Sequence, residues 1–325
     1  MENGKKRMAL LVGCNYPNTQ YSLHGCINDV VSMQELLMER LGFDKSSIEL
    51  LVDEGPWSKA LPTGVNIKNA LNKMIDETEE GDVLFFHYSG HGTLVPSKHH
   101  LNKKEEAIVP CDFNLITDVD FRQLVNGLPK GASFTILSDS CHSGGLIDKE
   151  KEQIGPNTLS PTSQLSNNLG PKHSKPKKIP IESMLNHLAS LTNMVESEIG
   201  EHLTTLFGDD ASLRFCLPEL DQDKLFGPHR PDSGILLSGC QTNETSADMP
   251  PMGSNGKAHG AFTYAVQSVF KAQQGPLSNR EVVMLSREVL EQEGLEGQHP
   301  CLYCSDENAD APFLMWDDAQ SKIDL

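Results

Sequence analysis

The chain alternates short apolar runs with segments of helical period, and this alternation constrains the fold more than any other feature. Apolar runs typical of buried strands occupy residues 7–14, 48–53, 82–88 and 133–140. Between them, apolar residues recur at helical spacing over 27–41, 67–75 and 117–128. Because strand–helix–strand units build parallel strands covered by helices, the pattern predicts an α/β fold with a mostly parallel central sheet flanked by helices.

The composition changes after residue 150. Residues 155–180 are rich in Pro, Ser, Asn and Lys and contain few core-forming residues, which predicts a flexible, disordered linker insert. Helical patterning returns over 181–210, and further strands are predicted at 232–240 and 298–305. We therefore expect one sheet built from two segments, with a large region at 1–150, a linker region at 151–230 and a small region at 231–325.

Charge and cysteine usage exclude several classes of partner. The chain has 45 acidic and 27 basic residues, a net charge of −18, so it repels nucleic acids and anionic membranes. Neither a membrane-spanning run nor a secretory cleavage site is evident at the N-terminal apolar run. The eight scattered cysteines are then expected to be free thiols in a reducing compartment. We expect a cytoplasmic or nuclear protein, whose release to the extracellular space would not use a signal peptide.

Chemically active side chains follow two of the predicted strands. The third strand runs into "HYSGHG", which supplies His87, Ser89 and His91. The fourth runs into "SDSCHSGG", which supplies Asp139 and Cys141. Functional residues gather past the carboxyl ends of parallel strands, so adjacent strands would place a thiol and an imidazole in one cleft.

This arrangement suits nucleophilic catalysis by cysteine. A cysteine nucleophile needs a nearby base, and amide donors must stabilise the oxyanion that forms. These requirements favour Cys141 as nucleophile and His91 as its base, with the amides of Gly92 and Cys141 as oxyanion donors. His87 is expected to be a packed, hydrogen-bonded residue of the strand end, and His142 adjoins the thiol, where neighbouring side chains diverge.

Three alternatives stay open on the residues alone. His87 and His91 are four apart and could bind zinc with Cys141, but the helix and the glutamate of such a site are missing. Ser140 or Ser143 could be a hydrolase nucleophile, but neither lies in a G-x-S-x-G turn. The cysteine and the histidines could also be packed residues without chemistry.

The motifs resemble one family. "HYSGHG" and "SDSCHSGG", together with "GCNYP", "HGCINDV", "AIVPCD" and "LITDVDF", are similar to the motifs of plant metacaspases, caspase-like cysteine peptidases. The gap before "DSGILLSGCQTNETSAD" is typical of type II, and the length resembles the metacaspase 9 subgroup. The resemblance covers nearly all of the chain outside the linker. It implies a caspase-like fold and hydrolysis of peptide bonds after Arg or Lys.

The resemblance also assigns residues. It implies a dyad of His91 and Cys141 and a pocket for the basic side chain lined by Asp29, Ser89 and Asp139. Carboxylates in that pocket fit, because a partly buried cation needs a charged partner; a solvated position in the first turn of a helix is the alternative for Asp29. Family zymogens cut their own linker after a basic residue, and here Lys177 or Lys178 precedes a helix in chain expected to be exposed.

Calcium dependence is the point where the chain departs from many type II relatives. Asp118, Asp120 and Asp148 remain weak calcium candidates, but "PSKHHLNKKEEAIVPCD" brings several cations close to the expected site. Calcium prefers six to eight oxygen ligands, so we expect no cofactor and no calcium requirement. The subgroup favours mildly acidic conditions, and His99 and His100 change charge in that range.

The expected partners follow from the same resemblance. They are protein or peptide substrates with Arg or Lys before the cleaved bond, and the chain itself as a processing substrate. The family implies a monomer. A catalytically silent caspase-like scaffold is the alternative function, although both dyad residues and both pocket acids are present.

Overall fold

A computed structural model of the chain describes residues 5–96, 104–147, 151–155, 174–195, 198–217, 234–241, 243–251 and 256–315. Within this part, a seven-stranded sheet has the order β2-β1-β3-β7-β10-β13-β8. Neighbours from β2 to β10 are parallel, whereas β13 is antiparallel to both β10 and β8. The strands are β1 (Arg7–Gly13), β2 (Ile48–Val52), β3 (Val83–Ser89), β7 (Ser133–Asp139), β8 (Glu152–Ile154), β10 (Gly234–Ser238) and β13 (Cys301–Tyr303). The prediction of a mostly parallel sheet built from two chain segments is confirmed.

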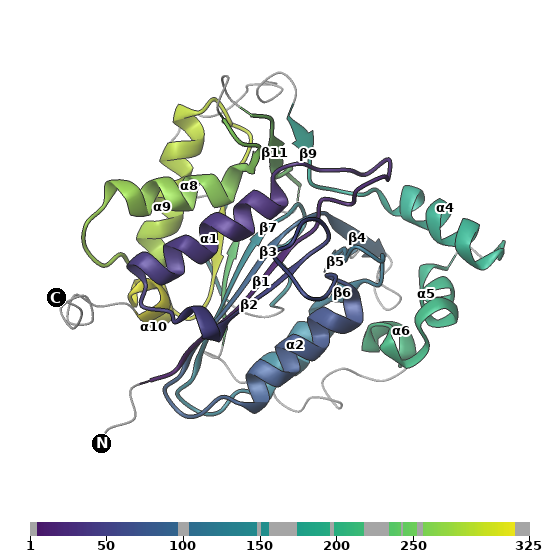
Figure 1. Cartoon of the computed structure of the whole chain (residues 1–325), viewed down its shortest axis with the longest axis horizontal. Helices are drawn as coiled ribbons and strands as arrows, with labels where there is room; N and C mark the ends of the chain where they lie inside the picture. The colour runs from purple at the N-terminus through teal and green to yellow at the C-terminus, as the bar shows by residue number, and fades with distance from the viewer. Residues whose placement is uncertain are drawn as a thin grey trace.

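Helices cover both faces of this sheet, with α1, α8 and α9 on one side and α2 on the other (Figure 1). Helix α1 buries Val30, Met33 and Leu37, which recur at the three- and four-residue spacing of one helical face. The chain leaves α1 through Gly42, whose φ of +69° suits glycine. The helices around the central sheet, with α3 and α10 added, have these bounds: α1 (Cys26–Arg40), α2 (Gly64–Asp76), α3 (Asp118–Asn126), α8 (Ala261–Ala272), α9 (Asn279–Gln292) and α10 (Asp306–Asp310). Two short helical turns are η1 (Lys45–Ser47) and η4 (Phe313–Met315).

Two small antiparallel sheets flank the central one, and the sequence did not predict them. One contains β4 (Gly92–Pro96), β5 (Lys104–Ile108) and β6 (Ile116–Thr117). The other contains β9 (Lys175–Pro176), β11 (Ala247–Met249) and β12 (His259–Gly260). These strands have two to five residues each and no clear apolar alternation, so only tertiary pairing defines them.

The linker prediction is wrong for its last part. Residues 174–180 were expected to belong to a disordered segment, but they are described, and β9 pairs with β11. Backbone pairing and burial of Lys177 order this stretch, and neither is visible in its composition. Residues 156–173 of the predicted linker lie outside the described residues.

The predicted helical character of 181–210 is confirmed. A group of short helices lies beside the β4–β5–β6 sheet (Figure 1). It consists of α4 (Ile181–Thr192), α5 (Ile199–Phe207), the turn η3 (Gly208–Asp210) and α6 (Leu213–Cys216). Met184 and Leu188, one turn apart on α4, are buried in the main core, which anchors this group.

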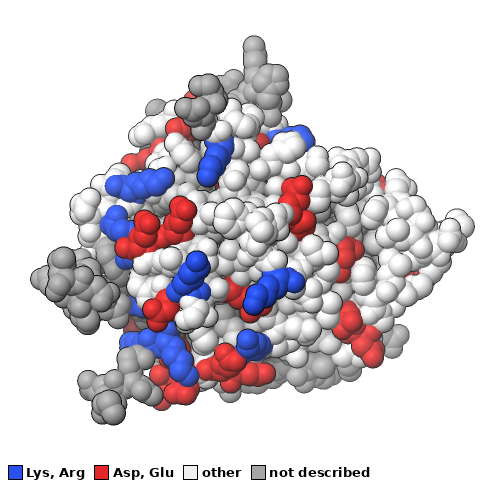
Figure 2. All heavy atoms as spheres, viewed as in Figure 1, with Lys and Arg blue, Asp and Glu red and all other residues white. Residues whose placement is uncertain are grey.

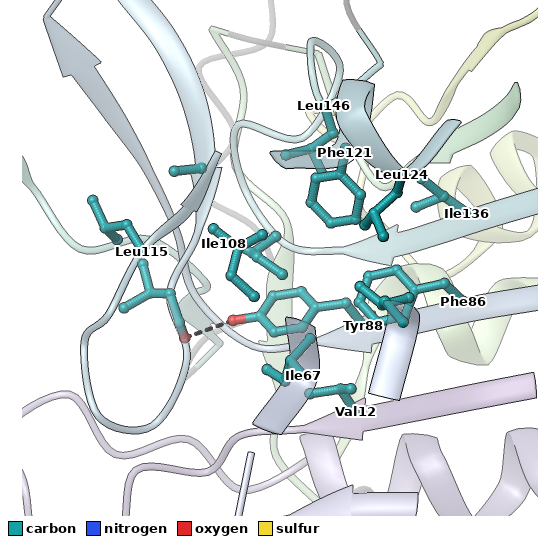
Figure 3. Packing of buried hydrophobic residues seen from close by; sticks show 14 of the residues in the cluster. Val12, Ile67, Phe86, Tyr88, Ile108, Leu115, Phe121, Leu124, Ile136 and Leu146 are labelled. Atoms are coloured by element: carbon teal, nitrogen blue, oxygen red, sulfur yellow. Dashed lines mark hydrogen bonds between the residues drawn. The ribbon is translucent and has the colours of Figure 1, made fainter. Parts of the chain in front are cut away.

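Two buried tyrosines connect the core to the loop after β3. In the core of Figure 3, the Tyr88 hydroxyl donates a hydrogen bond to the carbonyl oxygen of Val109 at 2.8 Å. The same hydroxyl lies 2.9 Å from the carbonyl oxygen of His91, whose backbone N–H donates to the Tyr16 hydroxyl at 2.9 Å. Buried tyrosine hydroxyls need such partners. The core therefore fixes the backbone on which His91 sits.

The surface shown in Figure 2 interleaves Lys and Arg side chains with Asp and Glu side chains, without a broad basic patch on that face. Such a surface offers no footprint for a nucleic-acid backbone there. In the described part of the chain, every helix is too short or too polar to cross a membrane.

Candidate active site

The two chemically active loops start from paired residues on neighbouring strands. In the β3–β7 ladder, Ser89 is the register partner of Asp139. His91 and Cys141 each follow two residues later, beyond the same edge of the sheet. The prediction that parallel pairing places these loops side by side is confirmed.

The linker residue Lys177 occupies a closed pocket at this edge. Its side chain is 0% exposed, and Nζ lies 3.2 Å from Asp139 Oδ1 and 3.4 Å from Asp29 Oδ2. Nζ also donates a hydrogen bond to Ser89 Oγ at 2.9 Å. Burying an ammonium group is unfavourable unless charges and hydrogen bonds compensate it. The pocket is therefore complementary to one positive charge at the end of a long aliphatic stem.

Backbone and hydroxyl groups hold the first carboxylate in place. Both oxygens of Asp29 accept hydrogen bonds from the Gly260 amide, at 2.8 and 2.9 Å, and Oδ2 accepts another from Ser89 Oγ at 2.6 Å. A Cβ atom on Gly260 would overlap Lys177 Nζ and the oxygens of Asp29 and Asp139. Glycine at position 260 is therefore what leaves room for a cation between the two acids. The alternative of a solvated Asp29 is wrong, because this residue is 1% exposed.

The second carboxylate faces the start of helix α8. Asp139 Oδ2 accepts hydrogen bonds from the Thr263 amide and hydroxyl, both at 2.8 Å, and Oδ1 accepts one from Ser246 Oγ at 2.6 Å. Amides in the first turn of a helix carry partial positive charge and favour an anion. The geometry stabilises Asp139 as a carboxylate even when it is buried.

The two acids differ in their protonation tendencies. Burial raises the pKa of Asp29 to about 6, although Lys177 opposes the shift. Burial would also raise the pKa of Asp139, but Lys177 and the hydrogen bonds from Ser246 and Thr263 outweigh it and lower that pKa below its usual value. Burial alone would lower the pKa of Lys177, whereas Asp139, Cys26 and Asp29 raise it. Lys177 is therefore a cation, and Asp139 is its principal counter-ion.

The backbone of Lys177 is held as firmly as its side chain. Its carbonyl oxygen accepts hydrogen bonds from the amides of Gly92 at 3.0 Å and Cys141 at 3.2 Å. These are the two donors predicted from the sequence, and a Cβ atom on Gly92 would overlap the carbonyl oxygen of Cys141. Two amides converging on one carbonyl oxygen form the geometry of an oxyanion hole.

The Cys141 thiol is buried beside Ser246. The Ser246 amide donates to Cys141 Sγ at 3.1 Å, and Sγ lies 3.5 Å from the Ser246 carbonyl oxygen. An amide directed at sulfur stabilises negative charge there. The Ser246 carbonyl oxygen also accepts a hydrogen bond from the Lys177 amide at 2.9 Å, so one residue contacts both the thiol and the segment in the pocket.

His91 has a defined tautomer. Its Nε2 lies 2.7 Å from the Tyr21 carbonyl oxygen, which can only accept, so Nε2 carries the proton and Nδ1 carries a lone pair. Within the described residues, Nδ1 makes no hydrogen bond of ordinary geometry, although the ring interacts with the Lys177 backbone. Burial lowers the pKa of His91 to about 4. The ring is therefore neutral near pH 7 and able to accept a proton.

His87, Ser140 and Ser143 are hydrogen-bonded to neighbouring residues. His87 is buried, its Nε2 lies 3.1 Å from Thr263 Oγ1, and burial lowers its pKa to about 3. Ser140 Oγ lies 2.9 Å from Ser138 Oγ, and Ser143 Oγ donates to the Ser140 carbonyl oxygen at 3.2 Å. His142 has a positive φ of 56° in the turn after the thiol. Among the described residues, no three His, Cys, Asp or Glu side chains meet as a metal site, so the zinc alternative finds no support here.

The segment around Lys177 contacts the protein on both sides of the thiol. Towards its N-terminus, Lys175 pairs with Asp248 in the β9–β11 ladder. Towards its C-terminus, the Ile179 amide donates to the Gly92 carbonyl oxygen at 3.1 Å, and Thr93 Oγ1 donates to the Ile179 carbonyl oxygen at 2.8 Å. Lys178, the other predicted processing residue, is exposed. An extended segment hydrogen-bonded on both sides is the binding mode of a peptide added to a sheet edge.

Two of the three calcium candidates, Asp118 and Asp120, lie in the first turn of helix α3. The Asp120 oxygens accept hydrogen bonds from the Thr117 amide at 2.8 Å and the Leu213 amide at 3.3 Å, so this carboxylate caps helix α3 and holds α6. Asp118 is buried in the first turn of α3. Asp148 lies outside the described residues, as do His99 and His100 of the cation-rich loop.

Comparisons with known proteins identify the family. The caspase-domain family matches residues 6–311. The chain is 56% identical to Metacaspase-9 of Arabidopsis thaliana over 319 residues, which cover 95% of this chain and 97% of that protein. The chain is a metacaspase. It is also 36% identical to Arabidopsis Metacaspase-6, over 95% of this chain and 99% of that one.

A solved structure agrees on the architecture. A crystallised protein from Geobacter sulfurreducens matches with a TM-score of 0.62 and 19% identity, covering 96% of this metacaspase and all of that chain. At that identity the likeness concerns the fold alone. Together with the family match, it confirms the predicted caspase-like fold, and family membership makes this metacaspase a cysteine-type endopeptidase.

Several residues of the metacaspase site escaped sequence reasoning. Ser246, Gly260 and Thr263 hold the pocket acids, Tyr21 fixes the His91 tautomer, and the Asp248 carboxylate accepts from the amides of the loop before α1. They lie on short strands, loops and a helix start without a hydrophobic period. The only sequence signals were the small and polar runs "SAD" and "HGAFT", which did not point to a role.

Proposed function

We propose that this metacaspase cleaves peptide bonds after Lys or Arg through Cys141 and His91, and that its own Lys177–Lys178 bond is a substrate. One observation carries the proposal. The side chain of Lys177 lies between two buried carboxylates while its carbonyl oxygen accepts from the Gly92 and Cys141 amides. A charge-recognition pocket and an oxyanion hole are therefore filled by the same residue.

The reaction follows from these positions. Sγ of Cys141 attacks the carbonyl carbon of Lys177, and the Gly92 and Cys141 amides stabilise the oxyanion. His91 Nδ1 takes the thiol proton and passes it to the leaving amine of Lys178. Water, deprotonated by the same imidazole, then hydrolyses the thioester and restores the thiol.

The preference for a basic side chain rests on electrostatics. A neutral or acidic side chain would leave Asp139 buried without its counter-ion, which costs several kcal/mol. An Arg guanidinium carries the same charge and donates in a fork that suits carboxylates. Discrimination against Asp before the cleaved bond is the expected consequence, because a third carboxylate would face Asp29 and Asp139.

The uncut chain is expected to be a zymogen that blocks itself. Lys177 is fully buried in the pocket, so another substrate cannot enter until the segment leaves. Between the two processing candidates, the position of the carbonyl oxygen favours cleavage after Lys177 rather than after Lys178.

The test compares four proteins. Wild type is expected to hydrolyse an Arg-ended fluorogenic peptide and to separate into two fragments, whereas Cys141→Ala should do neither. Lys177→Ala should stay uncut, and the matched control Lys178→Ala should be processed like wild type. If Lys177→Ala were cut at the wild-type rate and position, the proposal that the Lys177–Lys178 bond is the processing site would be contradicted. Hydrolysis of the peptide by Cys141→Ala would contradict the proposed nucleophile.

A further inference from the structure

A second cysteine follows a strand next to the one that leads to Cys141. Strand β10 pairs with β7 in parallel, with Ser238 opposite Ser138, and the Gly239 amide extends the ladder by donating to the Ser138 carbonyl oxygen at 2.8 Å. Cys240 therefore lies beside Ser140, one residue before Cys141. Neighbouring strands are about 4.8 Å apart, so the two cysteines follow adjacent strand ends at one edge of the sheet.

The two thiols lie at neighbouring strand ends and influence each other electrostatically. Cys240 Sγ lies 3.9 Å from the carbonyl oxygen of Ser140, the residue before Cys141, and the Cys141 thiol is the first cause that raises the pKa of Cys240. Both side chains are 0% exposed, and both are free cysteines. Cys240 has no part in the proposed dyad, the oxyanion hole or the pocket for the basic side chain. A nucleophilic sulfur with a second sulfur as neighbour has a defined oxidation chemistry.

We propose that Cys240 is a resolving thiol for Cys141, so that a hydroperoxide converts the pair to a reversible Cys141–Cys240 disulfide. The Cys141 thiolate attacks one peroxide oxygen, the O–O bond breaks, and Cys141 becomes a sulfenic acid as hydroxide leaves. The Cys240 thiol loses its proton and attacks the Cys141 sulfur, and the S–O bond breaks with loss of water. Overall, two thiols and one hydrogen peroxide give one disulfide and two waters. A dithiol reverses the reaction.

The surroundings of Cys240 favour this order of events. The Cys141 thiol, burial and the negative charge on Cys141 raise the pKa of Cys240, so it is a poor nucleophile while Cys141 is reduced. A sulfenic acid on Cys141 is neutral, which removes the charge repulsion. The His142 backbone amide interacts with Cys240 and opposes the rise in its pKa. Cys240 thus gains reactivity only after Cys141 is oxidised.

The linker adds a condition that rests on the proposed function. In the uncut chain the Lys177 carbonyl group lies against the Cys141 amide, and the thiol is fully buried. Peroxide should reach Cys141 faster once the segment has left the site. We therefore expect the mature enzyme to be more sensitive to peroxide than the Lys177→Ala precursor.

The experiment uses the processed enzyme. It is treated with a small excess of hydrogen peroxide, quenched and alkylated, then assayed on the Arg-ended peptide before and after dithiothreitol and analysed by peptide mass spectrometry. Wild type should lose most of its activity, regain more than half with dithiothreitol, and yield a peptide pair linked through Cys141 and Cys240. Cys240→Ala and Cys240→Ser should be active when reduced but should not recover, because the sulfenic acid proceeds to sulfinic acid.

Cys216→Ser, which removes a partly exposed thiol that contacts Gly208 and Ala211, is the matched control and should recover like wild type. Equal recovery of wild type and both Cys240 variants, or Cys141 joined to another cysteine, would overturn the proposal. If both variants misfold, the linked peptide in wild type decides alone. Failure of the proposed function has a separate signature, because the reduced wild type would then not cut the peptide while the disulfide would still form.

Discussion

Gly260→Ala is the sharpest test of the pocket. The φ of Gly260 is −73° and its ψ is 137°, a conformation that alanine adopts freely, so the substitution introduces no backbone strain. The added Cβ would instead overlap Lys177 Nζ and the carboxylate oxygens of Asp29 and Asp139. The change therefore acts on the space for the substrate's cation and leaves Cys141 and His91 in place.

The magnitude follows from what the cation loses. Breaking a buried ion pair by displacing one partner costs about 3–5 kcal/mol. At about 1.4 kcal/mol per factor of ten, kcat/KM for an Arg-ended peptide should fall by about a hundredfold to a few thousandfold. Self-processing should slow in parallel, because Lys177 uses the same pocket.

The assay measures kcat/KM together with alkylation of Cys141 by iodoacetamide. Alkylation should persist in Gly260→Ala, since the thiol and its hydrogen bonds to Ser246 do not involve residue 260. The matched control is Gly275→Ala, where a Cβ would meet open space, and its kinetics should equal wild type. A Gly260→Ala enzyme that keeps more than a third of the wild-type kcat/KM would refute the assignment of this pocket.

Three other predictions test different parts of the site. Asp139→Asn should lower kcat/KM for Arg-ended and Lys-ended peptides by about a hundredfold or more, because it removes the principal counter-ion of the substrate's cation. A variant whose kcat/KM equals that of wild type would show that the cation binds elsewhere. The pKa of His87 is about 3 in the folded protein and near 6.5 in the unfolded chain. Its contribution to the free energy of unfolding is therefore complete above pH 6.5. That contribution falls by up to about 1.4 kcal/mol per pH unit as the pH drops towards 3, because only the unfolded chain binds the proton in this range. Urea midpoints at pH 7 and pH 4.5 should therefore differ less in His87→Gln than in wild type, and equal differences would contradict this account. We also propose that calcium is not required, so EGTA should leave peptide hydrolysis unchanged, and activity that vanishes with the chelator and returns with calcium would contradict it.

The sequence predicted most where a local pattern could be combined with a general rule of topology. Apolar runs separated by helical segments predicted a parallel sheet, and parallel strands have one shared carboxyl edge. That rule alone brought "HYSGHG" and "SDSCHSGG" together, with Ser89 now found opposite Asp139. The choice of His91 over His87 also follows local reasoning, because His87 belongs to a continuous buried strand.

The tertiary structure decided what encloses this edge. Gly260, Thr263 and Ser246 come from the small region, more than a hundred residues after Asp139, and no periodic pattern marks them. The same holds for the segment around Lys177, whose composition predicts disorder. A buried ion cluster and strand pairing with β11 order it, and these are interactions between distant parts of the chain. Sequence determines which side chains a strand end presents, whereas burial and pairing across the fold determine which of them share a pocket.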